Sequence, residues 1–374
     1  MALLALAGWW VARAPLVERP AARAPDIDLD PPALRAQREA ALALATAPDD
    51  PWTFAQSLGA SAPEAGADKA RCGDDERPRF ADPEVRDGSM VMDQLAAAGP
   101  HYLAARARMD AALRASADRL DRAVADWLDV GQMRTPAGRV DALVQQALTT
   151  TNARVYSLAY RTCLAGRPAT ASCAALSARR WADIDAGNGV PWLFAFDQAR
   201  NANDAAGQQD ALARLAAASR FDEYHFAQAA AVAAHAGANE QDLAAFGDLS
   251  AEAVGKTFAV MTPVPTLFAA CRGKAGGDVV RAQQCQAISD AMFDHTDSVF
   301  LRGMSGALQA QTTGDETRRE VARAERALAA RDWSPATGFS ECQQARDVLK
   351  ILLRKGQVGE VEEARERARV FVTP

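Results

Sequence analysis

The sequence predicts an all-α fold in which stacked antiparallel helical hairpins, arranged like an α-solenoid, follow an N-terminal helical lobe. Aromatic residues make up only 6% of the 374 residues, whereas alanine is abundant throughout. This composition favours close helix packing over sheets. Helix-length segments also alternate with brief breaks from residue 138 to 371, which is typical of hairpins stacked in sequence. An irregular all-helical domain whose hairpins merely have similar lengths is the alternative.

The N-terminal part of the chain divides into a leader, a linker and a helical lobe. Residues 1–12 form an apolar run that is shorter than the roughly 18 residues needed to span a bilayer. The run resembles the apolar region of a secretory signal, so we expect the remnant of a signal or signal-anchor helix. An ordinary N-terminal core helix is the alternative. Residues 13–31 combine prolines with alanines and charges, which predicts an extended linker.

Residues 32–135 are predicted to form the N-terminal lobe. Short helices are expected at 32–46 and 51–58, before an irregular segment at 59–88 that is rich in Gly, Pro and charge. A single long helix is expected to start near Pro100 and to continue through Leu128, because apolar residues recur on one face at helical spacing.

Residues 136–374 are predicted to form the repeat-like domain. Asn188 and Gly189 are expected to supply positive φ angles at a helix end, and Pro191 suits the first turn of the next helix. Asp297 and Asp315 are expected to be helix N-caps. The predicted helices are 138–149, 153–165, 170–185, 190–202, 205–219, 222–236, 239–255, 263–273, 278–293, 297–313, 315–331, 339–355 and 359–371.

The charge balance argues against a nucleic-acid-binding protein. The chain has 42 basic and 48 acidic side chains and a net charge of -6. A nucleic-acid binder would instead gather basic residues on one face. Contact with a membrane is expected only through the N-terminal segment.

The six cysteines predict disulfide bonds. None of them forms a CxxC pair, which excludes the common zinc and dithiol redox motifs. Cys163 and Cys173 lie ten positions apart and Cys271 and Cys285 lie fourteen apart, so each pair can bridge neighbouring helices. By elimination the third predicted bond joins Cys72 and Cys342. Six buried free thiols in a reducing compartment are the alternative.

Two segments resemble a repeat family. The segment WADIDAGNGVPWLFAFDQARNANDAAGQQDAL begins at Trp181 and resembles a tetratricopeptide-type unit, with an Asn-containing turn and Trp192 early in its first helix. GEVEEARERA resembles the break of such a unit, with Gly359 at the turn and Ala364 at the small packing position. Between them, DSVFLRGMSGALQAQTTGDETRREVARAERAL has suitable lengths but carries Arg319 where a small residue is expected. The resemblance to degenerate tetratricopeptide or Sel1-like repeats implies a right-handed superhelix that binds a protein or peptide without catalysis.

The sequence predicts no catalytic, metal or cofactor site. His225 and His235 are expected on one helix, but ten positions separate them, so they cannot chelate one metal. The segment Asp294–Asp297 is interpreted as a solvated helix cap. Aromatic residues cluster between positions 181 and 226, where they form either core or anchors for a partner. The candidates for partner binding are Trp181, Trp192, Phe196, Phe221 and Tyr224.

These observations favour a non-enzymatic scaffold, adaptor or immunity-type inhibitor in an exported setting, periplasmic or anchored in the inner membrane. The alternative is a membrane-anchored steric chaperone resembling lipase foldases. The run RFDEY at residues 220–224 is a scrambled version of their Arg-x-x-Phe-Asp-Tyr signature. A third hypothesis is an enzyme with an unrecognised helical active site. A cluster of buried carboxylates with strongly shifted pKa values in one cleft would favour it.

Overall fold

The computed structural model describes residues 100–129, 137–165, 170–236, 240–257, 260, 262–272, 279–331 and 342–372. Within these ranges the protein consists of fifteen α-helices and one 3-10 helix, and its only β-structure is two isolated bridges. The all-α prediction is confirmed for this part of the chain.

The helices fall into two groups along the chain. The first group contains α5 (Pro100–Ala115), α6 (Arg119–Asp129), α7 (Ala137–Leu148), α8 (Ala153–Leu164), η1 (Ala171–Ala175), α9 (Ala178–Ile184), α10 (Val190–Asn201) and α11 (Ala205–Ala216). The second contains α12 (Ala227–Ala234), α13 (Glu240–Thr257), α14 (Val264–Cys271), α15 (Val279–Asp294), α16 (Val299–Thr313), α17 (Thr317–Arg331), α18 (Cys342–Val358) and α19 (Glu360–Val372). None of these described helices is long and apolar enough to cross a bilayer. The predicted leader, the linker and residues 32–88 lie outside the described residues.

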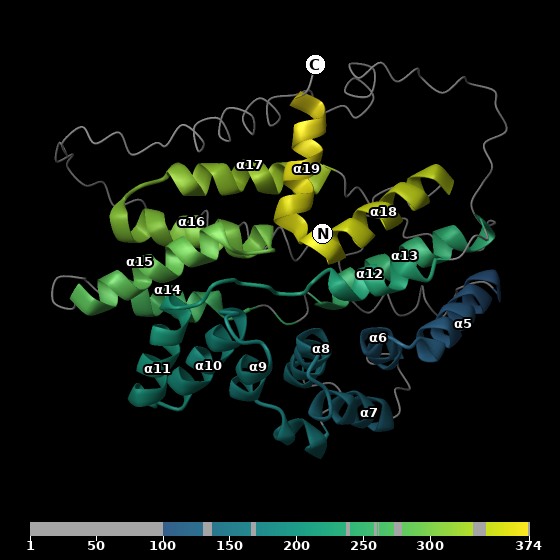
Figure 1. Cartoon of the computed structure of the whole chain (residues 1–374), viewed down its shortest axis with the longest axis horizontal. Helices are drawn as coiled ribbons and strands as arrows, with labels where there is room; N and C mark the ends of the chain where they lie inside the picture. The colour runs from purple at the N-terminus through teal and green to yellow at the C-terminus, as the bar shows by residue number, and fades with distance from the viewer. Residues whose placement is uncertain are drawn as a thin grey trace, which may run out of the picture.

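The two groups form two rows with an extended segment between them. Figure 1 shows α5–α11 along the lower side and α12–α19 above, and residues 217–226 pass between the rows. Helix α18 packs against α12 and α13, and α11 packs against α15, although each pair is distant in sequence. In a solenoid each repeat contacts only its neighbours. The chain folds back on itself, so the predicted solenoid arrangement is not confirmed.

One large hydrophobic core joins the two rows. The core contains an aromatic group of Tyr160, Trp181 and Phe194, in which Tyr160 meets Phe194 edge to face with ring centroids 5.6 Å apart. Such offset aromatic contacts add stabilisation beyond the buried area alone. The core explains why the aromatic residues cluster in this stretch of the sequence.

Two predicted helices are broken by local capping. The long helix after Pro100 stops at Ala115, because Asp118 accepts a hydrogen bond from the backbone N–H of Leu120 (2.8 Å) and so starts α6. The predicted helix 170–185 is split into η1 and α9. Ser177 is the N-cap of α9 and accepts from the N–H of Arg180 at 3.1 Å.

The predicted helix 222–236 begins only at Ala227. The preceding residues are not helical, because Phe221 exchanges backbone hydrogen bonds with the turn between α15 and α16: its N–H donates to the carbonyl of His295 (2.9 Å). His225 therefore precedes α12 and His235 lies at its C-cap, so the two histidines do not share a helix.

Two of the three predicted disulfides are confirmed. Cys163 and Cys173 are bonded with their Cα atoms 5.5 Å apart, and Cys271 and Cys285 with theirs 5.9 Å apart. The first bond ties the end of α8 to η1, and the second ties the end of α14 to α15. Cys72 lies outside the described residues, so its bond to Cys342 stays a prediction.

Candidate functional site

The turn before α10 fixes the start of the extended segment. Gly187 has the positive φ of 86°, whereas Gly189 has a φ of -75°, so the prediction of a positive φ at Asn188 and Gly189 was wrong by one or two positions. Gly189 is needed for a different reason. A Cβ atom there would lie 2.2 Å from the ring of Phe221, so only glycine lets this buried ring pack against the turn.

Buried polar side chains hold the next part of the segment. The side chain of Asn188 donates to Asp185 (2.8 Å) and to the carbonyl of Asp222 (3.0 Å). Asp185 also accepts from the indole N–H of Trp181 (3.2 Å) and from the hydroxyl of Tyr224 (3.1 Å). Tyr224 has a φ of 59°, a conformation that is uncommon for a bulky residue and that tends to occur at functional sites.

Asp297 connects three elements. Its carboxylate accepts from the backbone N–H groups of Glu223 (2.9 Å) and Tyr224 (3.4 Å) in the extended segment. Its carbonyl accepts from the N–H of Glu360 (2.8 Å) at the start of α19. Ser298, not Asp297, is the N-cap of α16, so that prediction was wrong. The Asp297 carboxylate therefore supports the extended segment and does not cap α16.

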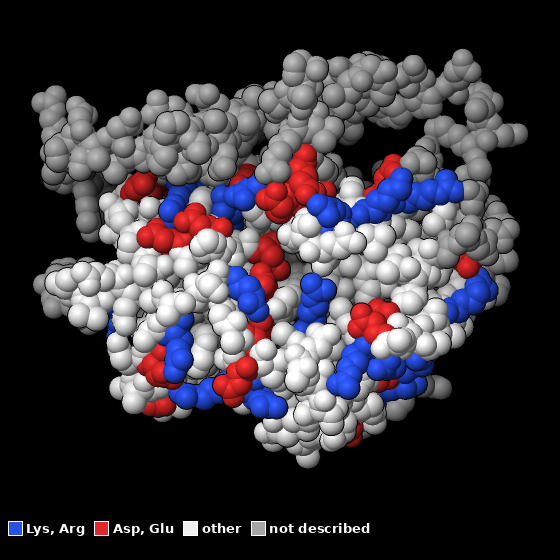
Figure 2. All heavy atoms as spheres, viewed as in Figure 1, with Lys and Arg blue, Asp and Glu red and all other residues white. Residues whose placement is uncertain are grey.

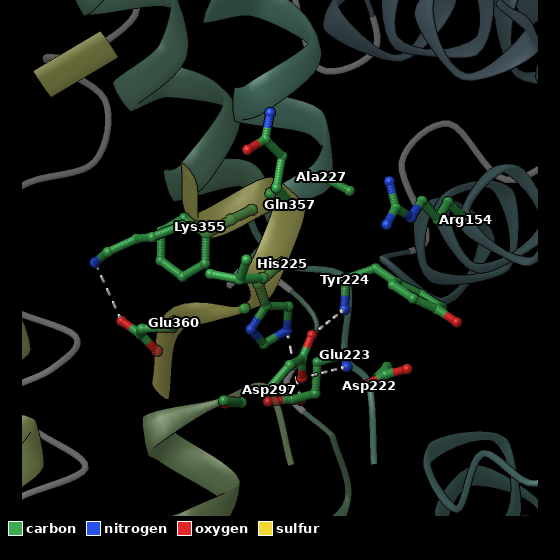
Figure 3. A pocket seen from close by; sticks show the side chains of 15 residues that line it. Arg154, Asp222, Glu223, Tyr224, His225, Ala227, Asp297, Lys355, Gln357 and Glu360 are labelled. Atoms are coloured by element: carbon green, nitrogen blue, oxygen red, sulfur yellow. Dashed lines mark hydrogen bonds and ion pairs between the residues drawn. The ribbon is translucent and has the colours of Figure 1, made fainter. Parts of the chain in front are cut away.

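These connections enclose a cavity of about 140 Å³, which we call the central cavity. Figure 2 shows acidic and basic groups gathered around a hollow near the middle of the displayed face. Four elements contribute: the start of α8, the extended segment, the α15–α16 turn and the α18–α19 turn (Figure 3). The charged and histidine side chains of the lining are Arg154, Asp222, Glu223, His225, Asp297, Lys355 and Glu360.

A buried ionic group backs one wall of the cavity. Glu223 is 1% exposed and lies 3.7 Å from the guanidinium of Arg161, which also donates to the carbonyl of Val260 (2.9 Å). Burial alone would raise the pKa of Glu223, but the positive charge of Arg161 and the hydrogen bond from Thr262 outweigh burial and hold that pKa below its usual value. Burial also lowers the pKa of His225 to about 4, so the imidazole is neutral at neutral pH. It can then accept from Arg161, 3.3 Å from its Nε2 atom.

The α18–α19 turn forms the opposite wall. Its shape depends on Gly359, which has a φ of 87°, a conformation that favours glycine. The ammonium group of Lys355 lies 3.6 Å from Glu360 and 4.7 Å from the centre of the Phe226 ring. Burial raises the pKa of Glu360 although Lys355 opposes that rise.

Two charged side chains that line the cavity form no ion pair in the described part of the chain. Glu223 pairs with Arg161, Glu360 with Lys355, and Asp222 with Arg220 at 2.7 Å. Within the described part of the chain, Asp297 forms no ion pair, although its charge attracts that of the nearby Arg161. The guanidinium of Arg154 makes no hydrogen bond or ion pair there either, and lies 5.8 Å from the centre of the Tyr224 ring.

The unpaired acid has a strongly shifted pKa. Burial, followed by the charge of Asp222, raises the pKa of Asp297 well above its usual value, and the hydrogen bonds from the extended segment only partly oppose this rise. Burial also raises the pKa of Asp222, and it raises that of Glu363 on α19 to about 7. A partly buried carboxylate outside any ion pair is costly to ionise, so Asp297 differs from the other acids of this cavity.

The five aromatic candidates fall into two classes. Trp181, Phe196 and Phe221 are almost completely buried and belong to the core, so their side chains do not form a surface for a partner. Trp192 and Tyr224 are half-buried, and only Tyr224 lines the central cavity. Of the five predicted partner-binding residues, Tyr224 is therefore the one that contributes to the central cavity.

Four residues of the site were missed by sequence reasoning: Arg154, Asp297 as a partly buried acid, Lys355 and Glu360. They come from separate elements, and their spacing in the sequence carries no motif. The acidic segment that ends at Asp297 was the only available signal. Its position between two helices favoured a solvated cap.

The described residues contain no group of three or more His, Cys, Asp or Glu side chains placed to hold a metal ion. Comparisons of the chain with protein-family models, curated proteins and solved structures found no match. The central cavity is therefore the feature of the described chain that points to a function.

Proposed function

We propose that this protein is a non-enzymatic binding protein of an exported setting and that a protein or peptide partner docks at the central cavity. One observation carries the proposal. Asp297 and Arg154 line the same cavity, and neither has an ion-pair partner in the described part of the chain. A docked partner can supply the missing counter-charges, and it would gain specificity from doing so.

The two disulfides support the exported setting, because such bonds persist mainly in oxidising compartments. A periplasmic location, either free or tethered to the inner membrane through the N-terminal segment, agrees with this chemistry. A scaffold, an adaptor and an immunity-type inhibitor all fit a helical binding protein. The resemblance to tetratricopeptide or Sel1-like repeats supports a binding role only through the turn at Gly359, which lines the central cavity.

An enzyme is a second candidate, because the raised pKa values of Asp222, Asp297, Glu360 and Glu363 meet the criterion of shifted carboxylates in one region. Binding is favoured over catalysis because these acids already have roles in holding backbone or side chains. Asp297 holds two N–H groups and Glu360 accepts from Val299 (3.1 Å). A steric chaperone resembling lipase foldases is the remaining alternative, and refolding of a neighbouring hydrolase with and without this protein tests it.

A photo-crosslinking residue at position 154 tests the proposed docking site in the native organism. Arg154 is exposed at the cavity, so its replacement leaves the core intact. The matched control carries the same crosslinker at Asp210 of α11, a partly exposed position that does not line the cavity. We expect one discrete crosslinked species from position 154 and none from position 210. Equal labelling at both positions, or none at either, would exclude this docking site.

A further inference from the structure

We propose that the central cavity recognises a primary ammonium group, such as a lysine side chain or the N-terminus of the partner. The inference rests on the proposed docking site and names the chemistry of the group that enters it. Its physical basis is the imbalance between acidic and basic groups inside the cavity.

The first observation is that the carboxyl group of Asp297 forms no ion pair in the described part of the chain. Its carboxylate accepts two backbone N–H groups, yet no cation of the described chain pairs with it, and the neighbouring charge of Asp222 opposes its ionisation. Hydrogen bonds from neutral N–H groups stabilise a carboxylate less than an ion pair that also forms hydrogen bonds. An ammonium group in the cavity would supply the missing positive charge.

The second observation is independent of Asp297. Glu223 lines the same cavity, and its Oε1 atom accepts from Thr262 and faces Arg161. The hydroxyl of Ser298 also stabilises this carboxylate, but no donor among the described residues makes a hydrogen bond of regular geometry to the buried Oε2 atom. A buried oxygen without a donor is expensive, and an ammonium group offers three donors. An ammonium group would therefore stabilise both carboxylates.

The cations of the cavity lining do not satisfy this need. Lys355 reaches Glu360, and its ammonium group points away from Asp297 and Glu223 in Figure 3. Arg154 lies on the other side of the cavity in the same view, against the ring of Tyr224. A volume of about 140 Å³ is large enough for an ammonium group with several methylene groups. The exposed Arg154 would repel such a ligand, which makes the charge of Arg154 a second testable element.

The experiment titrates the purified, oxidised full chain with three small probes and follows binding by NMR chemical shifts. N-acetyl-lysine N-methylamide represents a side chain, glycine N-methylamide represents an N-terminus, and N-acetyl-norleucine N-methylamide is the uncharged control. We expect saturable shifts with at least one of the two amines and none with the norleucine compound. The stronger of the two amines identifies the source of the ammonium group.

Three variants identify the site. Asp297→Asn should weaken binding of the amine at least about tenfold, the effect of losing one charged hydrogen bond. Arg154→Gln should strengthen binding a few-fold, because it removes a repulsive charge without touching the core. Asp210→Asn, which removes an acid away from the cavity, should leave binding unchanged. If Asp297→Asn does not fold, the increased affinity of Arg154→Gln still decides the question.

Equal binding of the norleucine compound, no binding of either amine, or weaker binding by Arg154→Gln would overturn the inference. The docking proposal is tested separately. Crosslinking from position 154 together with no amine binding means that a partner docks there through other chemistry.

Discussion

Two regions of the molecule bury charge in different ways. We call the first the paired cluster: Arg302 of α16, Glu325 of α17, Arg365 of α19 and the ring of Phe293. Arg302 is hydrogen-bonded to Glu325 and to the carbonyl of Phe293, and its guanidinium lies 3.8 Å from the centre of the Phe293 ring. The other oxygen of Glu325 faces Arg365 at 3.3 Å. Each polar atom of the acid has a partner.

The central cavity lacks this complete pairing. Asp297 has backbone partners but no cation in the described chain, and Glu223 leaves one oxygen without a donor. A buried acid that is fully paired fixes the packing of helices, whereas a partly satisfied acid beside a cavity has capacity left for a ligand. The comparison therefore separates structural charges from those that we assign to binding.

The largest effect is expected from Glu325→Gln in the paired cluster. The variant leaves Arg302 buried without its anion, and breaking a buried pair by removing one partner costs about 3 to 5 kcal/mol. Chemical denaturation at neutral pH measures the loss in free energy of unfolding. A loss below about 1 kcal/mol would mean that the cluster contributes little, and the contrast with the cavity would disappear.

Gly359→Ala is expected to have the next largest effect, because it distorts the turn that supports Asp297. The positive φ costs about 1 to 3 kcal/mol for a residue with a side chain, and the new Cβ atom would lie 2.8 Å from the Cβ atom of Asp297. Gly314→Ala is the matched control, since Gly314 has a φ of 80° with no atom near its Cβ position. Thermal and denaturant unfolding should show a greater loss for Gly359→Ala than for Gly314→Ala. Equal losses would show that the turn does not press on Asp297.

The helices and two disulfides could be predicted from the sequence because both depend on local spacing. Apolar periodicity identified most helices of the described chain to within a few residues, and a separation of 10 or 14 residues placed two cysteine pairs across a turn. The extended segment was mistaken for the start of a helix. Its conformation is set by the α15–α16 turn, and no local pattern encodes that contact.

The candidate site depends on contacts between distant residues. The bond from the N–H of Glu223 to Asp297 spans 74 residues, and that from Arg161 to the carbonyl of Val260 spans 99. Asp297 looked like a helix cap because it stands just before α16, one residue ahead of the serine that does cap it. Local rules assign such a residue its commonest role, and only tertiary packing reveals a buried acid.

The stability of Glu363→Gln, relative to the wild type, is expected to change with pH. The pKa of Glu363 in the folded protein is about 7, above its ordinary value of 4.5, because the side chain is buried. Its stabilisation is therefore complete below about pH 4.5 and is lost as the pH rises towards 7. Glutamine does not titrate, so the stability of the variant relative to the wild type should increase over this range by about 1 to 2 kcal/mol, after allowance for screening. Urea unfolding at pH 4.5 and above pH 7 measures the change, and a constant difference would contradict it.

The smallest effect on stability is expected from Asp297→Asn, although it removes a carboxyl group just as Glu325→Gln does. The variant loses one acceptor for a backbone N–H group, which costs about 1 kcal/mol, but it also removes a carboxylate whose ionisation burial opposes. These terms oppose each other, so the free energy of unfolding at neutral pH should stay within about 1 kcal/mol of the wild type. Denaturation of both variants under the same conditions gives the direct contrast. If Asp297→Asn lost as much as Glu325→Gln, Asp297 would have a counter-charge in the folded protein, and its carboxylate would be a structural group like Glu325.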